Sequence, residues 1–198
     1  MKKTTLRKTI KARLAELSPK QLSAAGTAAA GQLPLLSHWD EFRSVLAFFS
    51  MQDEINTTHI METILKEKKI LFAPKIEGQT LVFYRVNQND LEHCVTAANN
   101  ISFGIGYREP KTDPDFILKP EDFPALVITP GIAFDRNLNR LGRGRGYYDR
   151  FFASLDAARL RYTALGLCMP CQLVEEVPSG HQDKKMDALL TETSVINK

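Results

Sequence analysis

Short apolar segments that alternate with helix-like segments constrain the fold of this chain more than any other feature. The segments 43–50, 70–76, 125–134 and 162–169 are largely apolar and lack the regular polar positions of a half-exposed strand. Strands of this kind are buried on both faces, which is typical of a parallel sheet covered by helices. We therefore predict an α/β fold, in which residues 1–198 form a single three-layer α/β/α domain around a mostly parallel, Rossmann-like open sheet.

Helical signals fill the intervals between these segments. Apolar residues recur every three or four positions from about residue 4 to residue 17, which gives a helix one apolar face. Ser18 followed by Pro19 is typical of the start of a second helix. The polar, proline-containing region from 87 to 120 is expected to be rich in loops. Further helices are expected over 57–69 and 147–161, and further strands over 80–86 and 194–198.

Composition limits the class of protein and its partners. No apolar run approaches the roughly 18 residues that a membrane span needs, so we expect no membrane partner. The charged N-terminus has no apolar signal-peptide core, which favours a cytoplasmic location; its basic character also resembles a transit peptide, but residues 14–23 continue as an ordinary helical pattern. The net charge of +3 is too mild to indicate a nucleic-acid partner. A monomer is the default expectation.

Three segments are expected at one edge of the sheet. In open parallel sheets, ligands bind beyond the carboxyl ends of the strands. Residues 50–54 ("SMQDE") follow the first strand, Pro130 and Gly131 follow a later one, and a glycine-rich loop precedes the helix at 147. A binding site is therefore predicted where these segments meet.

The glycine-rich loop has the composition of an anion site. Glycine lets the backbone approach a ligand closely, and backbone N–H groups at a helix start favour a phosphate. Arginines add charges that can bind phosphate oxygens in pairs. The loop matches neither the GxxxxGK[ST] nor the GxGxxG pattern, because Tyr147 replaces the third glycine of the latter. A flexible surface hairpin with solvated arginines stays open as the alternative. The residues concerned are Arg140, Gly142, Arg143, Gly144, Arg145 and Gly146.

Asp149 and the cysteines each allow more than one interpretation. Asp149 follows the loop by three residues, where a carboxylate suits either Mg²⁺ on bound phosphates or the positive end of a helix dipole. Cys168 and Cys171 have CxxC spacing, but a zinc site would need a second pair or further histidines. We interpret both cysteines as structural.

Four segments, in this order along the chain, resemble those of one enzyme family. They are "KTTLR" (3–7), "FFSMQDEINT" (48–57), "PGIAFDRNLNRLGRGRGYYDRF" (130–151) and "HQDKKMDALLTE" (181–192). Together they resemble the 5-formyltetrahydrofolate cyclo-ligases, also called 5,10-methenyltetrahydrofolate synthetases, over essentially the whole chain. Arg145 departs from the pattern, since many members carry glycine or lysine there.

The resemblance implies an ATP-dependent, ring-closing C–N ligase that acts on small molecules. Its reaction converts 5-formyltetrahydrofolate, with Mg²⁺ as cofactor and ATP as co-substrate, to 5,10-methenyltetrahydrofolate, ADP and phosphate. The formyl oxygen is a poor leaving group. Transfer of the γ-phosphoryl group to that oxygen makes it a good one, so that N10 can attack the formyl carbon and phosphate can leave.

The resemblance also implies site residues. Catalytic candidates are Arg7, Arg143 and Arg145, and the candidate Mg²⁺ ligands are Asp149 and Asp187. The candidate folate-binding residues are Phe49, Met51, Glu54, Phe103, Arg143, Gly144, Arg145, Gly146 and Tyr147. The candidate ATP-binding residues are Lys3, Thr4, Thr5, Leu6, Arg7, Arg140, Leu141, Gly142, Arg143, Gly144, Arg145, Gly146, Tyr147 and Tyr148.

The residues alone leave some of these roles open. Lys3 and Arg7 lie one helical turn apart, which suits either a phosphate grip or a solvated helix face. Glu54 can accept hydrogen bonds from the donor edge of a pterin, or it is an exposed acid at a helix start. Of Tyr147 and Tyr148, one is expected to face the substrate and the other the core.

Two other functions compete with the folate reaction. One is another ATP-dependent ligase of the phosphoryl-activating kind, with a different acceptor; the presence of both residues 50–54 and the glycine loop argues against it. The other is a nucleotide- or RNA-binding module. RNA binding usually adds exposed aromatic residues or a broad basic face, whereas the aromatic residues here lie mainly in apolar runs.

Overall fold

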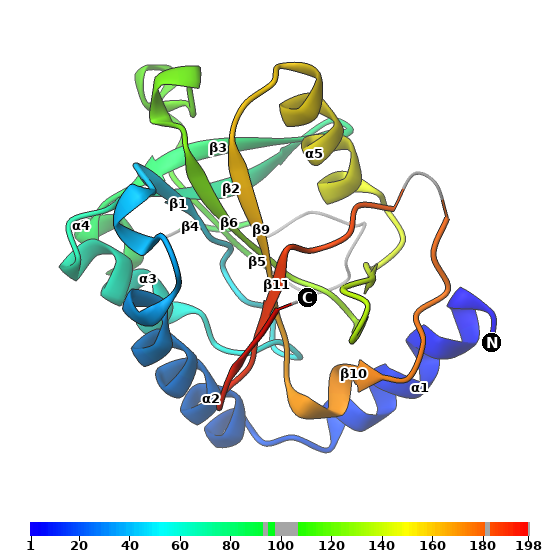
Figure 1. Cartoon of the computed structure of the whole chain (residues 1–198). Coiled ribbons are helices and arrows are strands. Elements are labelled where there is room, and N and C mark those ends of the chain that lie inside the picture. Colours follow the sequence, from blue (N-terminus) through cyan, green and yellow to red (C-terminus); the bar gives the residue numbers. More distant parts are fainter. Residues whose placement is uncertain (93–94, 98–106, 181–182, 198) are drawn as a thin grey trace.

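The computed structural model describes residues 1–92, 95–97, 107–180 and 183–197, and a seven-stranded sheet lies at its centre (Figure 1). All neighbours from β11 to β2 are parallel, and the two edge strands are antiparallel to their neighbours. The mostly parallel sheet is thus confirmed. Across the sheet, the strands are β12 (Val195–Asn197), β11 (Ala188–Leu190), β9 (Tyr162–Leu167), β6 (Ala125–Thr129), β1 (Ser44–Leu46), β2 (Ile70–Glu77) and β3 (Thr80–Val86).

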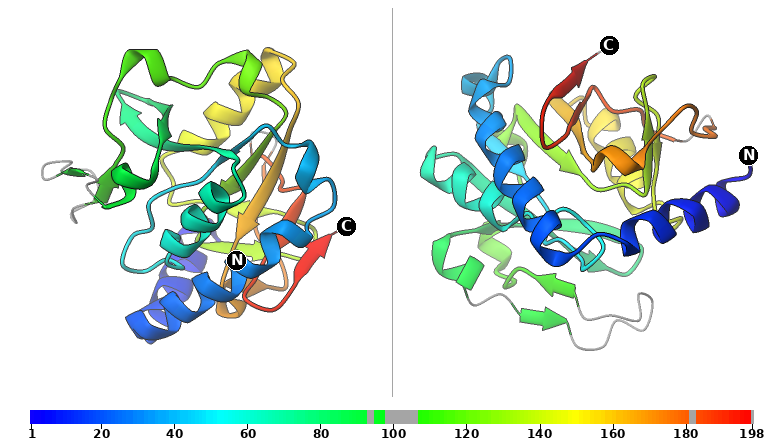
Figure 2. Two further views of the ribbon diagram at one scale, coloured as in Figure 1. Left: turned by 90° about the vertical axis from the view of Figure 1, so that its left-hand side faces the viewer. Right: turned by 90° about the horizontal axis from the view of Figure 1, so that it is seen from below.

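Helices cover both faces of this sheet (Figure 2). On one face lie α1 (Lys3–Ala15), α2 (Pro19–Gln32) and α3 (Thr58–Lys66), and on the other lies α5 (Tyr147–Ala157). Successive residues of β6 point to opposite faces: Leu126 and Ile128 join the core under α1–α3, while Ala125 and Val127 join the core under α5. This double burial explains why the central strands are apolar throughout.

The start of α2 follows its predicted signal. The Ser18 side chain accepts a hydrogen bond from the Gln21 N–H, the Gln21 side chain accepts one from the Ser18 N–H, and Pro19 occupies the first turn. This capping box satisfies backbone donors that a helix otherwise leaves free at its start.

The region from 87 to 120 contains only short elements among its described residues. They are α4 (Gln88–Glu92), β4 (Val95–Ala97), β5 (Tyr107–Glu109), η3 (Pro114–Phe116) and η4 (Pro120–Asp122). The β4–β5 pair lies outside the main sheet (Figure 2), and the Glu109 carboxylate accepts a hydrogen bond from the Ile76 N–H of β2 at 3.4 Å. The expectation of a loop-rich region thus holds, with a hairpin-like pair inside it.

A second sheet and three further 3₁₀ turns were not predicted. The sheet consists of β10 (Leu173–Val174), β7 (Ala133–Asp135) and β8 (Arg140–Leu141), and it carries the start of the glycine loop. The turns are η1 (Leu33–Leu35), η2 (Trp39–Glu41) and η5 (Pro170–Gln172). Cys168 lies shortly before η5 and Cys171 lies within it, and both are free thiols. Within the described part of the chain, no helix is long and apolar enough to cross a membrane.

Strand order creates a crevice between β1 and β6. These strands are neighbours and parallel, but the chain runs from β1 to β2 on one side and from β6 to β9 on the other. The connections therefore diverge at the carboxyl ends of β1 and β6, where open α/β sheets bind their ligands.

Candidate active site

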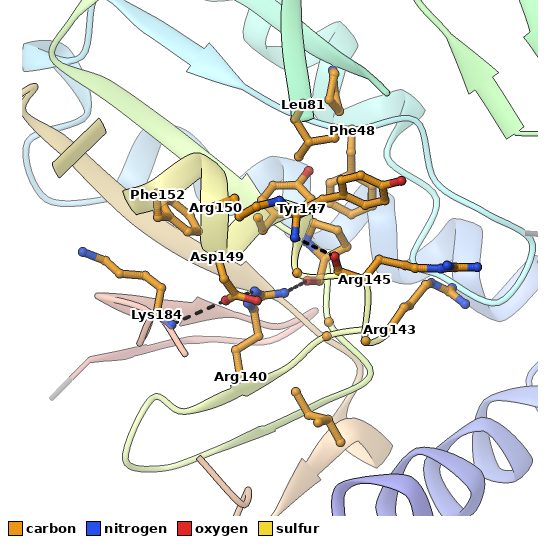
Figure 3. Close-up of a pocket in the computed structure, with 18 of the residues that line it drawn as sticks. Phe48, Leu81, Arg140, Arg143, Arg145, Tyr147, Asp149, Arg150, Phe152 and Lys184 are labelled. Carbon is orange, nitrogen blue, oxygen red and sulfur yellow. Dashed lines mark hydrogen bonds and ion pairs between the residues drawn. The ribbon is translucent and has the colours of Figure 1, made fainter. Parts of the chain in front are cut away.

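A cavity of about 820 Å³ opens at this crevice, a volume that suits small-molecule ligands. It lies between the segments that follow β1 and β6, the glycine loop with α5, and the first helix (Figure 3). The sequence-predicted residues that line it are Lys3, Arg7, Phe49, Met51, Glu54, Arg140, Leu141, Gly142, Arg143, Gly144, Arg145, Gly146, Tyr147, Tyr148 and Asp149.

The glycine loop joins β8 to α5 through backbone conformations that require glycine. Gly144 has φ +102° and Gly146, the N-cap of α5, has φ +68°. A Cβ atom on Gly142 would lie 2.9 Å from a guanidinium nitrogen of Arg140, and one on Gly144 would lie 3.4 Å from the Arg7 guanidinium. The loop therefore passes close to two cations at the positive end of a helix, as an anion site requires.

One face of α1 forms part of the cavity wall. Arg7 donates a hydrogen bond from Nε to the Gly142 carbonyl at 2.8 Å, and Lys3 Nζ pairs with Asp183 Oδ2 at 2.6 Å. Thr4 and Thr5 are exposed and Leu6 is buried in the core, so none of these three lines the cavity. Helical geometry explains the difference, because only residues three or four apart share a face. The structure thus brings Lys3 and Arg7, but not residues 4–6, to the site.

Arg143 crosses the cavity to the segment after β1. Its Nη2 contacts Asp53 Oδ1 and lies 2.9 Å from Glu54 Oε1, which also accepts from Nε at 3.3 Å. Burial lowers the pKa of Arg143, but the charges of Glu54 and Asp53 outweigh this, so its pKa is raised. Arg143 is therefore a fixed cation held by two carboxylates.

Glu54 is fixed at both carboxylate oxygens. Oε2 accepts a hydrogen bond from the Met51 N–H at 2.9 Å, and Oε1 faces Arg143. Burial raises the pKa of Glu54 more than the Arg143 charge lowers it. Phe49 and Met51 supply apolar walls beside this carboxylate. Phe103, the remaining folate candidate, lies outside the described residues.

Asp149 lies at the other end of the cavity, held by Arg140 (Figure 3). Arg140 Nη2 donates to Asp149 Oδ1 at 2.7 Å, and Arg140 Nη1 donates to the Pro130 carbonyl at 3.2 Å. The Lys184 N–H approaches the same Asp149 oxygen at 3.5 Å. These contacts hold the carboxylate between Arg140 of β8 and the backbone at Lys184.

Asp187, the second candidate Mg²⁺ ligand, does not line this cavity. It directly precedes β11 and lies level with Ala164 of β9, whose carbonyl accepts a hydrogen bond from the Asp187 N–H at 2.8 Å. Its carboxylate accepts a hydrogen bond from the Ala164 N–H at 2.7 Å. Among the described residues, no group of three or more histidine, cysteine or acidic side chains could hold a metal ion. A Mg²⁺ site made of Asp149 and Asp187 alone stays a prediction of the family resemblance.

Both tyrosines line the cavity, and Tyr148 also packs against the core. Tyr147 packs against the Arg150 guanidinium at 5.2 Å, while the Tyr148 ring lies 6.2 Å from that of Phe152 in the core under α5. The Tyr148 hydroxyl is buried and has no hydrogen-bond partner in the described structure. Burial, followed by the Glu54 charge, raises its pKa. Tyr148 thus offers an unused donor to a ligand.

Sequence reasoning missed several polar residues of the cavity wall. Lys184 and Asp156 form an ion pair at 3.2 Å, Asp183 pairs with Lys3, and Arg108 lies over the Phe49 ring. Asp183 and Lys184 belong to the segment 181–192, which resembles the family, but no helical or strand periodicity marks these two residues. Their position depends on how the chain crosses from η5 back to the sheet.

Comparisons with known proteins agree over almost the full chain. The model of the 5-formyltetrahydrofolate cyclo-ligase family matches residues 1–192. The probable 5-formyltetrahydrofolate cyclo-ligase of Schizosaccharomyces pombe is 28% identical, with 99% of this chain and 98% of that protein covered. The Escherichia coli 5-formyltetrahydrofolate cyclo-ligase is 27% identical, with 94% and 98% covered. The NMR structure of Aquifex aeolicus 5,10-methenyltetrahydrofolate synthetase superposes with a TM-score of 0.77 at 28% identity, with 100% and 93% covered.

Proposed function

The chain belongs to the 5-formyltetrahydrofolate cyclo-ligase family, and on this premise we propose that it uses ATP to convert 5-formyltetrahydrofolate to 5,10-methenyltetrahydrofolate. The family and its relatives support the cyclo-ligase activity and small-molecule substrates. The observation that carries the proposal is that one cavity joins a glycine-rich anion loop to a largely buried carboxylate, Glu54. These two features suit two different ligands, one rich in phosphate and one with a donor edge.

ATP would bind along the glycine loop. The backbone N–H groups of the loop and the first turn of α5, together with Lys3, Arg7 and Arg145, surround this part of the cavity. Arg145 is exposed at its rim, as a side chain that closes over a ligand would be. This arrangement would bind the phosphates and balance their charge.

The folate would bind on the Glu54 side. A pterin presents ring N–H and amino donors, which one carboxylate can accept in pairs. Arg143 now occupies the Glu54 oxygen Oε1, so the proposed substrate would displace it. A displaced Arg143 remains next to the loop, where it can neutralise the phosphoryl group in transfer.

The reaction then needs positioning and charge neutralisation more than covalent help. The formyl oxygen would attack the γ-phosphorus as the bond to ADP breaks. N10 would attack the formyl carbon, the C–O bond would break, and phosphate would leave with the formyl oxygen and the N10 proton. Arg7, Arg143 and Arg145 are the cations that would stabilise the charge in these steps.

The residues present fit one Mg²⁺ that arrives with the nucleotide. Protein sites for Mg²⁺ often use one or two carboxylates and complete the shell with phosphate oxygens and water. Asp149 is the carboxylate near the loop that would hold the ion, and Arg140 would keep it oriented. When bound, the ion would offset the negative charge of the phosphates.

A spectrophotometric assay tests the proposal. Protein, 5-formyltetrahydrofolate, Mg²⁺ and ATP are mixed, and the near-ultraviolet absorbance of the methenyl product is followed. An ATP-dependent rise, absent with a non-hydrolysable ATP analogue, is the expected result. A flat trace from folded protein that still binds ATP would reject the folate substrate and leave a phosphoryl-activating ligase with another acceptor.

A further inference from the structure

Arg108 is a cation in the apolar part of the cavity. It lies on β5, and its guanidinium is 5.2 Å from the centre of the Phe49 ring. It lines the cavity on the side formed by apolar residues of β2, β3 and the segment after β1. These residues are Phe48, Phe49, Pro74, Ile76 and Leu81. Neither the glycine loop nor the proposed phosphate contacts require an arginine here.

The charge of Arg108 is not neutralised by the described parts of the chain. Four other cavity cations pair with carboxylates: Lys3, Arg140, Arg143 and Lys184. Arg108 has only a weak hydrogen bond from Nη2 to Thr58 Oγ1, at 3.5 Å, and no acidic partner in residues 1–92, 95–97, 107–180 or 183–197. Thr58 is the first residue of α3, so the helix dipole adds to the positive potential. An anion is the complement that this part of the cavity lacks.

The geometry of Arg108 favours a carboxylate at the end of a flat ligand. A guanidinium that lies over an aromatic ring keeps its N–H edge free for paired hydrogen bonds. Glu54 and Phe49 both follow β1, so a ligand whose ring system binds Glu54 can extend along Phe49 toward Arg108. In 5-formyltetrahydrofolate the end opposite the pterin is a glutamyl group, which carries carboxylates.

We propose that Arg108 binds a glutamyl carboxylate of the folate substrate and so sets the preference for substrates that carry this group. This inference rests on the proposed function, because it takes the pterin of the same ligand to lie at Glu54. The other source of an anion in this cavity is the triphosphate of ATP, and the test separates the two.

Calorimetric titration with two matched ligands tests the role of Arg108. One ligand is 5-formyltetrahydrofolate, and the other is the primary amide of 5-formyltetrahydropteroic acid, which lacks the glutamyl group and has no free carboxylate. Wild type should bind the first about tenfold more tightly. Arg108→Ala should abolish this preference without changing the Kd of ATP, and Arg108→Lys should keep part of it. Arg85→Ala, at an exposed position of β3 outside the cavity, should keep all of it.

The possible results separate this inference from the proposed function. If Arg108→Ala weakens the binding of both folate ligands equally, Arg108 acts by packing on Phe49. If Arg108→Ala weakens only the binding of ATP, Arg108 binds phosphate. Either result overturns the inference. If Arg108→Ala keeps the wild-type preference and the wild type turns over 5-formyltetrahydrofolate, this inference alone is overturned. A wild type that binds neither folate ligand would overturn both proposals.

Discussion

Arg143 couples the two halves of the cavity at the scale of single residues. Its guanidinium contacts Asp53 and Glu54, so two negative charges surround one positive charge in the structure. An incoming phosphate must compete with these carboxylates for Arg143, and an incoming pterin must compete with Arg143 for Glu54. Binding of one substrate should therefore free a group that the other uses.

Glu54→Gln should affect the two substrates in opposite directions. It removes the charge that accepts the pterin donors, so 5-formyltetrahydrofolate should bind at least about tenfold more weakly. It also removes a negative charge next to Arg143, so ATP should bind about threefold more tightly without folate. Separate titrations of each ligand measure both effects. Asp53→Asn is the control and should tighten ATP alone; equal losses for both ligands in Glu54→Gln would contradict this coupling.

The raised pKa of Glu54 predicts a pH-dependent stability. Because the folded protein holds this proton more tightly than an unfolded chain, protonation of Glu54 stabilises the fold. The contribution is fully present below the ordinary value of 4.5 and is lost as the pH rises through the raised value. Relative to Glu54→Gln, the wild-type Tm should therefore rise as the pH falls from about 8 to about 5. Thermal unfolding of both proteins across this range measures the difference in Tm. A difference that stays constant, or that changes in the opposite direction, would contradict a raised pKa of Glu54.

The sequence predicted some site residues better than others, for geometric reasons. Glu54 and the glycine loop could be found because each directly follows a strand or precedes a helix that the apolar pattern marks. The position of Asp187 could not be predicted from periodicity, because β11 has only three residues. Arg108 was missed because its position depends on the β4–β5 pair lying against β2.

At the scale of elements, two glycines of α2 have opposite roles. Gly26 is buried, and a Cβ atom there would collide with the carbonyl oxygen of Asn56, in the segment before α3. The Asn56 N–H also donates to the Leu22 carbonyl at 3.2 Å, so this backbone is tied to α2. Gly31 has no atom within 4 Å of the corresponding Cβ position. The first glycine thus permits close packing, and the second only weakens the helix.

Alanine at these two positions should shift stability in opposite directions. Gly26→Ala should destabilise by about 2 kcal/mol or more, because α2 must move away from the segment before α3. Gly31→Ala should stabilise by about 0.5–1 kcal/mol, because alanine favours the helix and meets open space. Urea unfolding of both variants measures the changes. A Gly26→Ala variant as stable as wild type would show that α2 and the segment around Asn56 are not held this closely.

At the scale of the whole molecule, the mostly parallel main sheet with helices on both faces was predictable and the smaller sheet was not. Long apolar strands must be buried on both faces, so their pattern alone indicates a parallel sheet with two helical layers. The strands β8 and β10 have two residues each, too few to show any periodicity. Yet this smaller sheet positions Arg140 and the entry to the glycine loop, so the exact form of the cavity depends on contacts that no local pattern encodes.

The cavity also joins the two ends of the chain, which predicts how nucleotide binding affects global stability. Lys3 on α1 pairs with Asp183 near the C-terminus, and both line the cavity. The Lys3 side chain is 38% exposed, so the pair itself should add at most about 1 kcal/mol, and Lys3→Ala alone should lower Tm little. ATP with Mg²⁺ at about 100 times its Kd should raise the wild-type Tm by about 5–10 °C. At the same ligand concentration, this rise in Tm should be clearly smaller in Lys3→Ala, because a phosphate contact is lost. Lys8→Ala is the control and should show the full rise, because the exposed Lys8 side chain lies on α1 outside the cavity. Scanning calorimetry of the three proteins with and without nucleotide measures both effects, and an equal rise in all three would remove Lys3 from the nucleotide site.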